Sequence, residues 1–90
     1  MKFEWDDEKA QINLEKHGVS FYEASTVFGD PFLLVMPDPK HSHGEIRYVV
    51  LGRSSSSHVL VVIHVERGDN IRIISARQAT PREKRRYAQS

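Results

Sequence analysis

The alternation of hydrophobic and polar positions is most regular between residues 45 and 77. Three runs rich in β-branched and aromatic residues fill this stretch, at 45–54, 56–66 and 70–77, and serine, glycine and aspartate separate them. Because β-branched side chains lose χ1 freedom in a helix, the central sequence VLVVI favours a strand. The pattern therefore predicts an antiparallel meander of three strands.

Alternation also assigns the side chains of this meander to two faces. We assume hairpin loops of two or four residues, so that cross-strand partners share a face. The mostly apolar set, expected to face the core, is Tyr48, Val50, Val59, Val61, Ile63, Val65, Arg72, Ile74 and Ala76. The opposite set has an apolar middle and ionisable ends, and consists of Arg47, Val49, Leu51, Arg53, His58, Leu60, Val62, His64, Glu66, Ile71, Ile73, Ser75 and Arg77. A one-residue bulge in either hairpin would change these sets.

A short strand at 3–5 and a helix are predicted at the beginning of the chain. Asp6 or Asp7 caps this helix, and Gly18 ends it after two basic residues. Its apolar positions do not share one face, so we expect Trp5 and Val19 to help cover it.

A second helix is predicted to begin at Ser20, because Ser20 and Glu23 have the spacing of a capping box. Its apolar stripe consists of Phe21, Ala24, Val27 and Phe28. The sequence 29–31 ends the helix, and the continuous apolar run 32–36 predicts a buried strand.

The remaining segments complete an α+β domain. Residues 37–44 predict an exposed loop, and Thr80 followed by Pro81 predicts the start of a polar final helix over 82–87. The order is β-α-α-β-β-β-β-α, a mostly antiparallel sheet with helices packed beside it.

Length and composition limit the classes of protein. Ninety residues suit a single domain, 1–90, with a small core. No apolar run reaches about eighteen residues and no basic-then-apolar leader occurs, so we expect neither a membrane span nor a signal peptide. The absence of cysteine excludes disulfides and thiolate metal sites, and fits a reducing cytoplasm.

Charge is divided unevenly along the chain. Residues 1–45 contain four Lys or Arg against nine Asp or Glu, and residues 46–90 contain nine against three. A basic second half indicates a polyanionic partner, whereas the alternative is a surface on which the two halves neutralise each other.

The histidines outside the predicted meander do not indicate a specific functional site. His41 and His43 lie near Asp38, but no third ligand stands at a diagnostic spacing, so we expect no metal site and no cofactor. His17 at a helix end is typical of a cap.

The ionisable side chains of the second face suggest chemistry. Arg47, Arg53 and Arg77 are suited to holding phosphates, and His64 or Glu66 to accepting a proton. Attack by an RNA 2′-hydroxyl on its own phosphate needs a base, a cationic clamp and a proton donor. The alternative is that the arginines pair with acidic neighbours and only finish the sheet edge.

The basic run 82–86 is open to three interpretations. It can contact RNA phosphates without sequence preference, dock an acidic partner, or form a solvated helix surface.

Spaced sequence features along almost the whole chain resemble the family of BrnT-type toxins. They are Phe3-Glu4-Trp5-Asp6, Lys9-Ala10, Asn13, 16–21, Glu23-Ala24, Val27-Phe28, Asp30-Pro31, Gly44-Glu45, Arg47, Gly52-Arg53-Ser54, Glu66-Arg67, 71–77, Glu83 and Tyr87. The resemblance implies a RelE-like fold and a toxin of a type II toxin–antitoxin system that cleaves RNA and stops translation. It also implies a partner, a small, DNA-binding, BrnA-like antitoxin. The toxin–antitoxin complex would bind operator DNA only through this antitoxin.

Carried over onto this sequence, the resemblance implies a metal-independent endoribonuclease. Its expected catalytic residues are Glu66, Arg77, Arg53 and His64, and we expect Arg53, Glu66 and Arg77 to meet over one hollow. Its expected RNA-binding residues are Arg47, Lys16, Arg67, Arg82 and Arg85. Two alternatives remain: an inactive binding module that acts only within the antitoxin complex, and nucleic-acid binding by the basic helix of the free chain.

Overall fold

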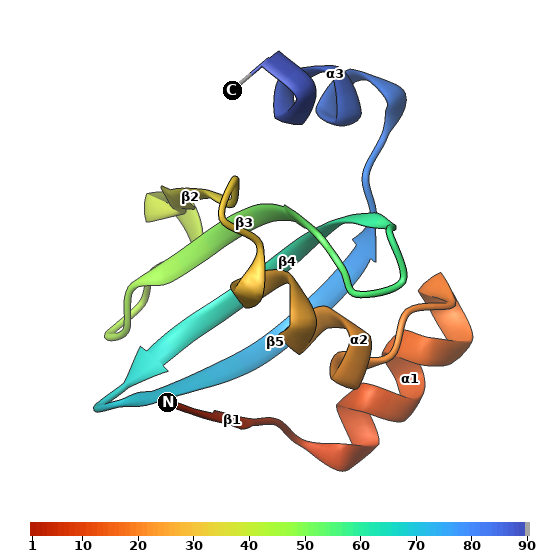
Figure 1. Ribbon diagram of the computed structural model, residues 1–90. Helices are drawn as coiled ribbons and strands as arrows, with labels where there is room; N and C mark the ends of the chain where they lie inside the picture. The colour runs from red at the N-terminus through yellow and green to blue at the C-terminus, as the bar shows by residue number, and fades with distance from the viewer. Residues whose placement is uncertain (90) are drawn as a thin grey trace.

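The computed structural model describes residues 1–89 and contains a five-stranded sheet with helices packed against it (Figure 1). The strands are β1 (Lys2–Glu4), β2 (Leu34–Pro37), β3 (Arg47–Arg53), β4 (Val59–Arg67) and β5 (Asn70–Gln78). The α-helices are α1 (Asp7–His17), α2 (Phe21–Thr26) and α3 (Pro81–Gln89), and short 3-10 turns are η1 (Val27–Gly29) and η2 (Pro39–His41). None of the described helices is long and apolar enough to cross a membrane.

The sheet has the order β1-β5-β4-β3-β2 and confirms the predicted α+β class. β1 runs parallel to β5, and every other neighbouring pair is antiparallel. In Figure 1, α1 and α2 lie against one face of the sheet, and α3 stands at the end where β5 finishes.

The predicted helix signals operate as expected in α1 and α2. The Asp6 carboxylate accepts from the Lys9 N–H, and Gly18 takes the left-handed conformation (φ 70°) that ends α1. Ser20 Oγ accepts from the Glu23 N–H at the start of α2. The Glu23 carboxylate, however, turns away from Ser20 to the β3–β4 loop, so the expected capping box is only half formed.

Two apolar clusters lie on opposite faces of the sheet. Buried side chains of α2 and its flanks pack on one face, which we call the α1/α2 face; this cluster consists of Val19, Phe21, Ala24, Val27, Val50, Leu60, Val62, Ile71, Ile73 and Ala76. The other, which we call the α3 face, carries Leu51, Val59 and Val61 beneath Ala79 and Tyr87. The sheet is therefore covered on both sides.

The predicted assignment of side chains to faces was wrong for β3 and part of β5. The β3–β4 loop has five residues, 54–58, so Arg53 pairs with Val59 and Val50 pairs with Val62. An odd loop shifts the pairing by one residue, and each side chain of β3 changes face relative to β4. Val50 consequently joins Leu60 and Val62 in the core.

The β4–β5 hairpin contains a bulge that divides β5 into two parts. Near its two-residue turn Glu66 pairs with Ile71, as expected for an even loop, but the register shifts between Ile63 and His64. Beyond that point Ile63 pairs with Ser75 and Val61 with Arg77. The bulge therefore places Arg77 on the α3 face, together with Arg53.

The apolar run 32–36 is not a buried strand. β2 is an edge strand of the sheet, Phe32 is 67% exposed and Val35 is 52% exposed. Its partner β3 covers only one edge, so the backbone of the other edge is free to pair with an added strand.

Asn13 of α1 closes part of the free edge of β5. β1 pairs with β5 only as far as Arg72. Farther along, Asn13 Nδ2 donates to the carbonyls of Ala76 (2.9 Å) and Val19 (3.0 Å), and Asn13 Oδ1 accepts from the Ala76 N–H (3.2 Å). This buried amide acts as a substitute for a neighbouring strand.

Candidate functional site

The predicted site residues separate onto the two faces of the sheet. Arg47, Arg53 and Arg77 pair with Val65, Val59 and Val61, so all three lie on the α3 face. Glu66 pairs with Ile71, and His64 pairs with Tyr48 and Ile73, which places both on the α1/α2 face. The prediction that Arg53, Glu66 and Arg77 meet over one hollow is therefore wrong.

Glu66 is also far from Arg53 along the sheet. Seven residues of β4 separate it from the position opposite Arg53, about 23 Å at the usual rise of a strand. It lines a shallow hollow of about 360 Å³ with Met1, Gly68, Asp69, Asn70 and Ile71. The charged side chains of this hollow are acidic, which does not suit a phosphate.

His64 lies inside the protein. Its ring is stacked on Tyr48 with the centroids 5.3 Å apart, and meets the ring of Phe28 edge-on at 5.1 Å. The residue is 2% exposed, and burial lowers the pKa of the imidazole. A substrate cannot reach this ring without opening the packing around it.

Arg53 borders a hollow of about 290 Å³ between the end of β3 and α3. The other lining residues are Ser57, His58, Val59, Gln78, Lys84, Tyr87 and Ala88. The Arg53 guanidinium donates to the Ser57 carbonyl (3.3 Å), and its Cζ lies 5.6 Å from the centroid of the Tyr87 ring. We refer to this hollow as the Arg53 pocket.

Asp30 fixes the base of the Arg53 pocket. One oxygen of its carboxylate accepts from the Arg53 N–H (2.8 Å) and from the Tyr87 O–H (2.5 Å). Burial alone raises the pKa of Asp30, but these hydrogen bonds and that of the Phe32 N–H outweigh it, and the net pKa is lowered. Burial and the ionised Asp30 raise the pKa of Tyr87, which stays protonated. The three groups hold β3, η1 and α3 together.

Arg77 is occupied by an ion pair. Its Nη1 and Nη2 donate to the two oxygens of Glu83 at 2.8 and 3.0 Å, and Nη1 also donates to the Gln78 carbonyl. Glu83 and Thr80 form a complete capping box at the start of α3. Arg77 therefore anchors α3 to β5. This structural role is close to the alternative prediction, in which the arginines pair with acidic neighbours.

The Arg77–Glu83 pair makes stability depend on acidic pH. The hydrogen bond from Arg77 is the largest cause that lowers the pKa of Glu83, and the hydrogen bond from the Thr80 N–H adds to it. Burial acts in the opposite direction, and the net pKa falls from 4.5 to about 2. A carboxyl with a depressed pKa stabilises the fold above its ordinary pKa and loses that contribution as the pH falls through the folded value. We expect Glu83→Gln to lose about 1–2 kcal/mol at pH 7, because solvent screens the pair.

Urea unfolding of Glu83→Gln and the unmodified protein from pH 7 to pH 2 measures this effect. Glutamine keeps a polar side chain at the capping position, so the comparison isolates the charge. The difference in the free energy of unfolding is expected to shrink between pH 4.5 and about 2. A difference that stays constant over this range would show that the charge pair is not its cause.

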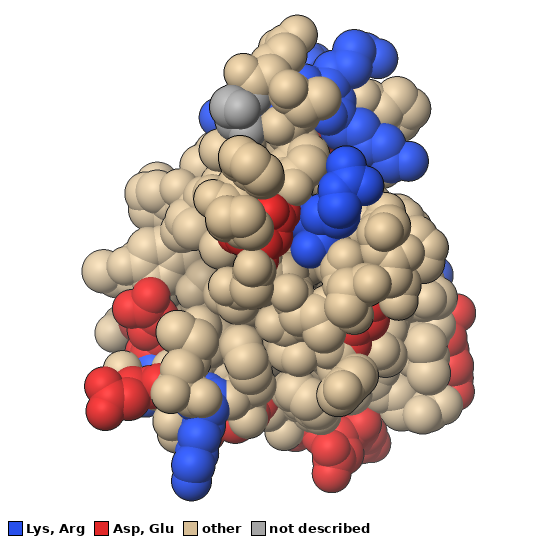
Figure 2. Space-filling view, in the orientation of Figure 1, with Lys and Arg blue, Asp and Glu red and all other residues tan. Residues whose placement is uncertain are grey.

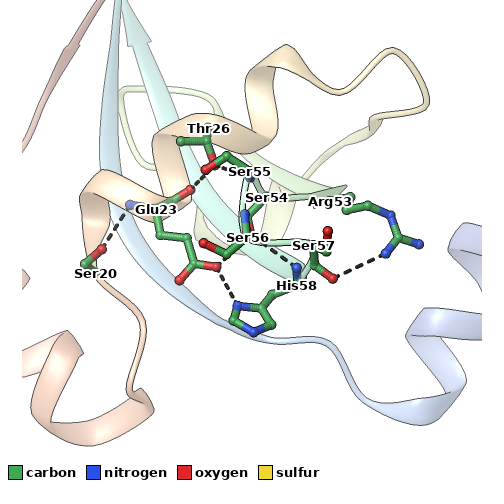
Figure 3. Close-up of polar contacts among 9 residues, drawn as sticks. All are labelled: Ser20, Glu23, Thr26, Arg53, Ser54, Ser55, Ser56, Ser57 and His58. Atoms are coloured by element: carbon green, nitrogen blue, oxygen red, sulfur yellow. Dashed lines mark hydrogen bonds and ion pairs between the residues drawn. The ribbon is translucent and has the colours of Figure 1, made fainter.

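A histidine–carboxylate pair beside the Arg53 pocket was missed by sequence reasoning (Figure 3). His58 Nδ1 lies 2.7 Å from Glu23 Oε2, which also accepts from Ser54 Oγ at 2.6 Å. Thr26 Oγ1 accepts from the Ser55 N–H, so α2 holds the loop at two points. The spacing of 35 residues between Glu23 and His58 gives no local signal. The spacing of Ser20 and Glu23 instead predicts a capping box, in which Glu23 would have a different partner.

The predicted RNA-binding residues occupy several places. Arg67 makes a two-point ion pair with Glu45 (3.0 and 3.1 Å) near the β4–β5 turn, and Lys16 lines a hollow of about 220 Å³ at the end of α1. Arg47 is on the α3 face at the opposite end of β3 from Arg53. Arg82 and Arg85 are exposed on α3.

Positive charge collects beside the Arg53 pocket. Figure 2 shows Lys and Arg side chains gathered over α3 at the top of the view, with acidic groups mainly below. The exposed cations of this helix are Arg82, Lys84, Arg85 and Arg86, and none of them has an ion pair with a carboxylate within residues 1–89. The arrangement can hold a phosphate chain beside an exposed histidine and the Arg53 guanidinium.

Comparisons with known proteins agree with this fold. A family described as "Ribonuclease toxin, BrnT, of type II toxin-antitoxin system" matches residues 5–83. The crystal structure of the ribonuclease toxin BrnT from Brucella abortus is similar with a TM-score of 0.70 and 28% sequence identity, over 89% of this chain and 97% of that one. No curated protein matches the sequence.

Proposed function

This chain belongs to the BrnT family of ribonuclease toxins of type II toxin–antitoxin systems, and we propose that it is a metal-independent endoribonuclease that inhibits translation by cutting RNA at the Arg53 pocket. The observation that carries the proposal is the guanidinium of Arg53. It faces an open hollow, whereas Arg77 and Arg67 are engaged by carboxylates.

Cleavage by 2′-hydroxyl attack fits the chemistry of this pocket. The attacking oxygen belongs to the substrate, so the protein must supply charge around the phosphorus and a group that takes the 2′-hydroxyl proton. Arg53 and Lys84 supply positive charge from two elements, β3 and α3. Arg82 and Arg85, which are exposed on the same helix, add positive charge for the RNA backbone.

Incubation of purified protein with RNA in excess EDTA tests the proposal directly. Because the reaction needs no metal ion, we expect fragments that end in 2′,3′-cyclic phosphate and begin with a 5′-hydroxyl. Intact RNA would contradict the proposal and favour a module that acts only within the antitoxin complex. Fragments that carry 5′-phosphate would indicate attack by water, and would contradict the 2′-hydroxyl mechanism.

The contribution of α3 to RNA binding is expected to depend on salt. Each phosphate contact to a single strand contributes a slope of about −0.7 to the logarithm of affinity against the logarithm of salt concentration. Arg82→Gln with Arg85→Gln should therefore reduce the magnitude of the slope by about 1.4, measured by fluorescence anisotropy with labelled RNA. The matched control, Lys2→Gln with Lys40→Gln, removes the same charge elsewhere and should leave the slope unchanged.

The family implies an antitoxin partner, and for it we propose a small, DNA-binding, BrnA-like protein that carries the operator-binding function. The free edge of β2 and the acidic surface of α1 are the two places suited to it. An extended segment docked on β2 would lie beside Arg86 and Gln89. These two residues line a hollow of about 450 Å³ together with Leu34, Val35 and Met36. An antitoxin bound there would lie against the basic helix α3.

A further inference from the structure

His58 has the surroundings of a proton-transfer group. The carboxylate of Glu23 holds one ring nitrogen, Nδ1, at 2.7 Å. Burial raises the pKa of Glu23, but the hydrogen bonds from Ser54 and His58 outweigh it and lower the net pKa, so the carboxylate is ionised at neutral pH. An ionised acceptor at Nδ1 selects the tautomer whose proton is on Nδ1, and leaves a lone pair on Nε2.

The position of this ring matches its chemistry. The His58 side chain is 49% exposed and lines the Arg53 pocket, while that of Glu23 is only 19% exposed behind it. His58, held by Glu23 at Nδ1, therefore borders the same hollow as the cations Arg53 and Lys84. The Glu23–His58 pair is not needed to hold the loop on α2, because the bonds of Ser54 and Thr26 already do so. A purely structural role would also not require the pair to border a cationic hollow.

We infer that His58 is the general base of RNA cleavage and that Glu23 is its positioning residue; the inference rests on the proposed ribonuclease function. His58 Nε2 takes the proton of the 2′-hydroxyl as the 2′-oxygen forms a bond to phosphorus. The bond from phosphorus to the 5′-oxygen breaks, and the leaving 5′-oxygen takes a proton from water. The products are a 2′,3′-cyclic phosphate and a 5′-hydroxyl, and His58 returns its proton to the solvent.

Three other histidines, His64, His41 and His17, are less suited to this role. His64 is buried between aromatic rings. His41 is held by Asp38 at 2.9 Å in the same manner as His58, but it lies in η2 and is not among the residues that line the Arg53 pocket. His17 lines a hollow of about 280 Å³ beside Arg77, but within the described residues no carboxylate orients its ring. His41 thus provides a matched control, and His17 is the competing base.

Steady-state cleavage of total bacterial RNA by His58→Gln tests the inference. We expect kcat to fall about 10²- to 10⁴-fold, with His41→Gln and His17→Gln close to the unmodified protein. Glu23→Gln should lose about 10- to 100-fold. Cleavage by His58→Gln at an unchanged rate, or loss with His17→Gln in its place, would overturn the assignment. If the unmodified protein itself cuts no RNA, the proposed function fails.

Two readouts separate catalysis from a structural role of the loop. Added imidazole should restore part of the activity of His58→Ala, which a folding defect would not permit. The rise of kcat/KM with pH that reports an ionising base should be present in the unmodified protein and absent from His58→Gln. The charged and titratable groups around His58 are Glu23 from α2, which contacts the ring, and Arg53 from β3 with Lys84 and Tyr87 from α3, which line the same hollow. Failure of both readouts would assign His58 a structural role only.

Binding can be followed without cleavage. A ten-residue thymidine oligonucleotide lacks the 2′-hydroxyl and so is not cut by this reaction. In NMR titrations with this probe we expect the Cε1–H resonance of His58 to shift, and that of His41 to stay unchanged. An unmoved His58 resonance at saturating probe would place the nucleic acid elsewhere and contradict the inference, even if the unmodified protein cleaves RNA.

Discussion

Arg53→Ala is expected to reduce RNA cleavage by about 10²- to 10³-fold, the usual effect of removing one cationic or hydrogen-bonding group that stabilises transition-state charge. The side chain of Arg53 donates to the Ser57 carbonyl and lies over the ring of Tyr87, whereas the hydrogen bond that connects β3 to Asp30 comes from the backbone N–H of Arg53. The substitution therefore removes charge from the pocket and keeps the contact that holds the fold. Rates of cleavage with total bacterial RNA measure the effect.

Growth provides a second measurement of the same variant. We expect cells to tolerate expression of Arg53→Ala without an antitoxin, while the unmodified protein arrests growth. Arg47→Ala is the matched control, because it removes an arginine from the same face about 20 Å away along β3. Full growth arrest by Arg53→Ala, or equal loss of activity in both variants, would contradict a specific role for the Arg53 pocket.

Asn13→Ala is expected to lower the free energy of unfolding by about 3 kcal/mol. This is the largest loss of stability that we predict for a single polar side chain. The amide makes three hydrogen bonds, and its loss leaves the N–H and carbonyl of Ala76 and the carbonyl of Val19 without partners in a buried environment. Each buried group left unpaired costs about 1–3 kcal/mol, less where water can enter. Urea denaturation measures the change.

Gln11→Ala is the control for this substitution. Gln11 lies on the same helix, and its amide bonds only to the exposed Glu15. We expect a change below about 0.5 kcal/mol, since exposed side-chain contacts contribute little. Equal stability of Asn13→Ala and Gln11→Ala would show that the edge of β5 does not need the asparagine.

The helices and the type of fold were predictable because their signals are local. Asp6, Gly18, Ser20 and Thr80 act through residues within four positions of each helix end, so the sequence contains both partners. The strands of the meander were equally clear from their β-branched composition. These features are sufficient for an α+β architecture.

The candidate site was not predictable because it depends on register. Whether the serine-rich β3–β4 loop has four residues or five decides which face Arg53 occupies, and the loop sequence favours neither. Ser57 in the left-handed conformation (φ 66°) accommodates the longer loop, although serine rarely adopts it. The consecutive apolar residues Ile73 and Ile74 were a weak sign of the bulge, since strict alternation fails there.

Register also explains why the predicted base was misplaced. The family resemblance covers Glu66, but it does not specify the face of the sheet on which its carboxylate lies. The structure places Glu66 on the opposite face from Arg53, and instead brings His58 to the pocket from the loop that set the register. A group that joins a site through a loop and a distant helix, as His58 does through Glu23, has no periodic signal in the sequence.

Comparison of Glu66→Gln with Arg53→Ala is the most direct test of whether cleavage occurs on the α3 face. Both side chains are ionisable, both belong to segments that resemble the family, and they lie on opposite faces of one sheet. In a single cleavage assay with total bacterial RNA, we predict that Glu66→Gln keeps the rate of the unmodified protein and that Arg53→Ala loses at least about 10²-fold. Loss of cleavage by Glu66→Gln with activity retained by Arg53→Ala would contradict the account.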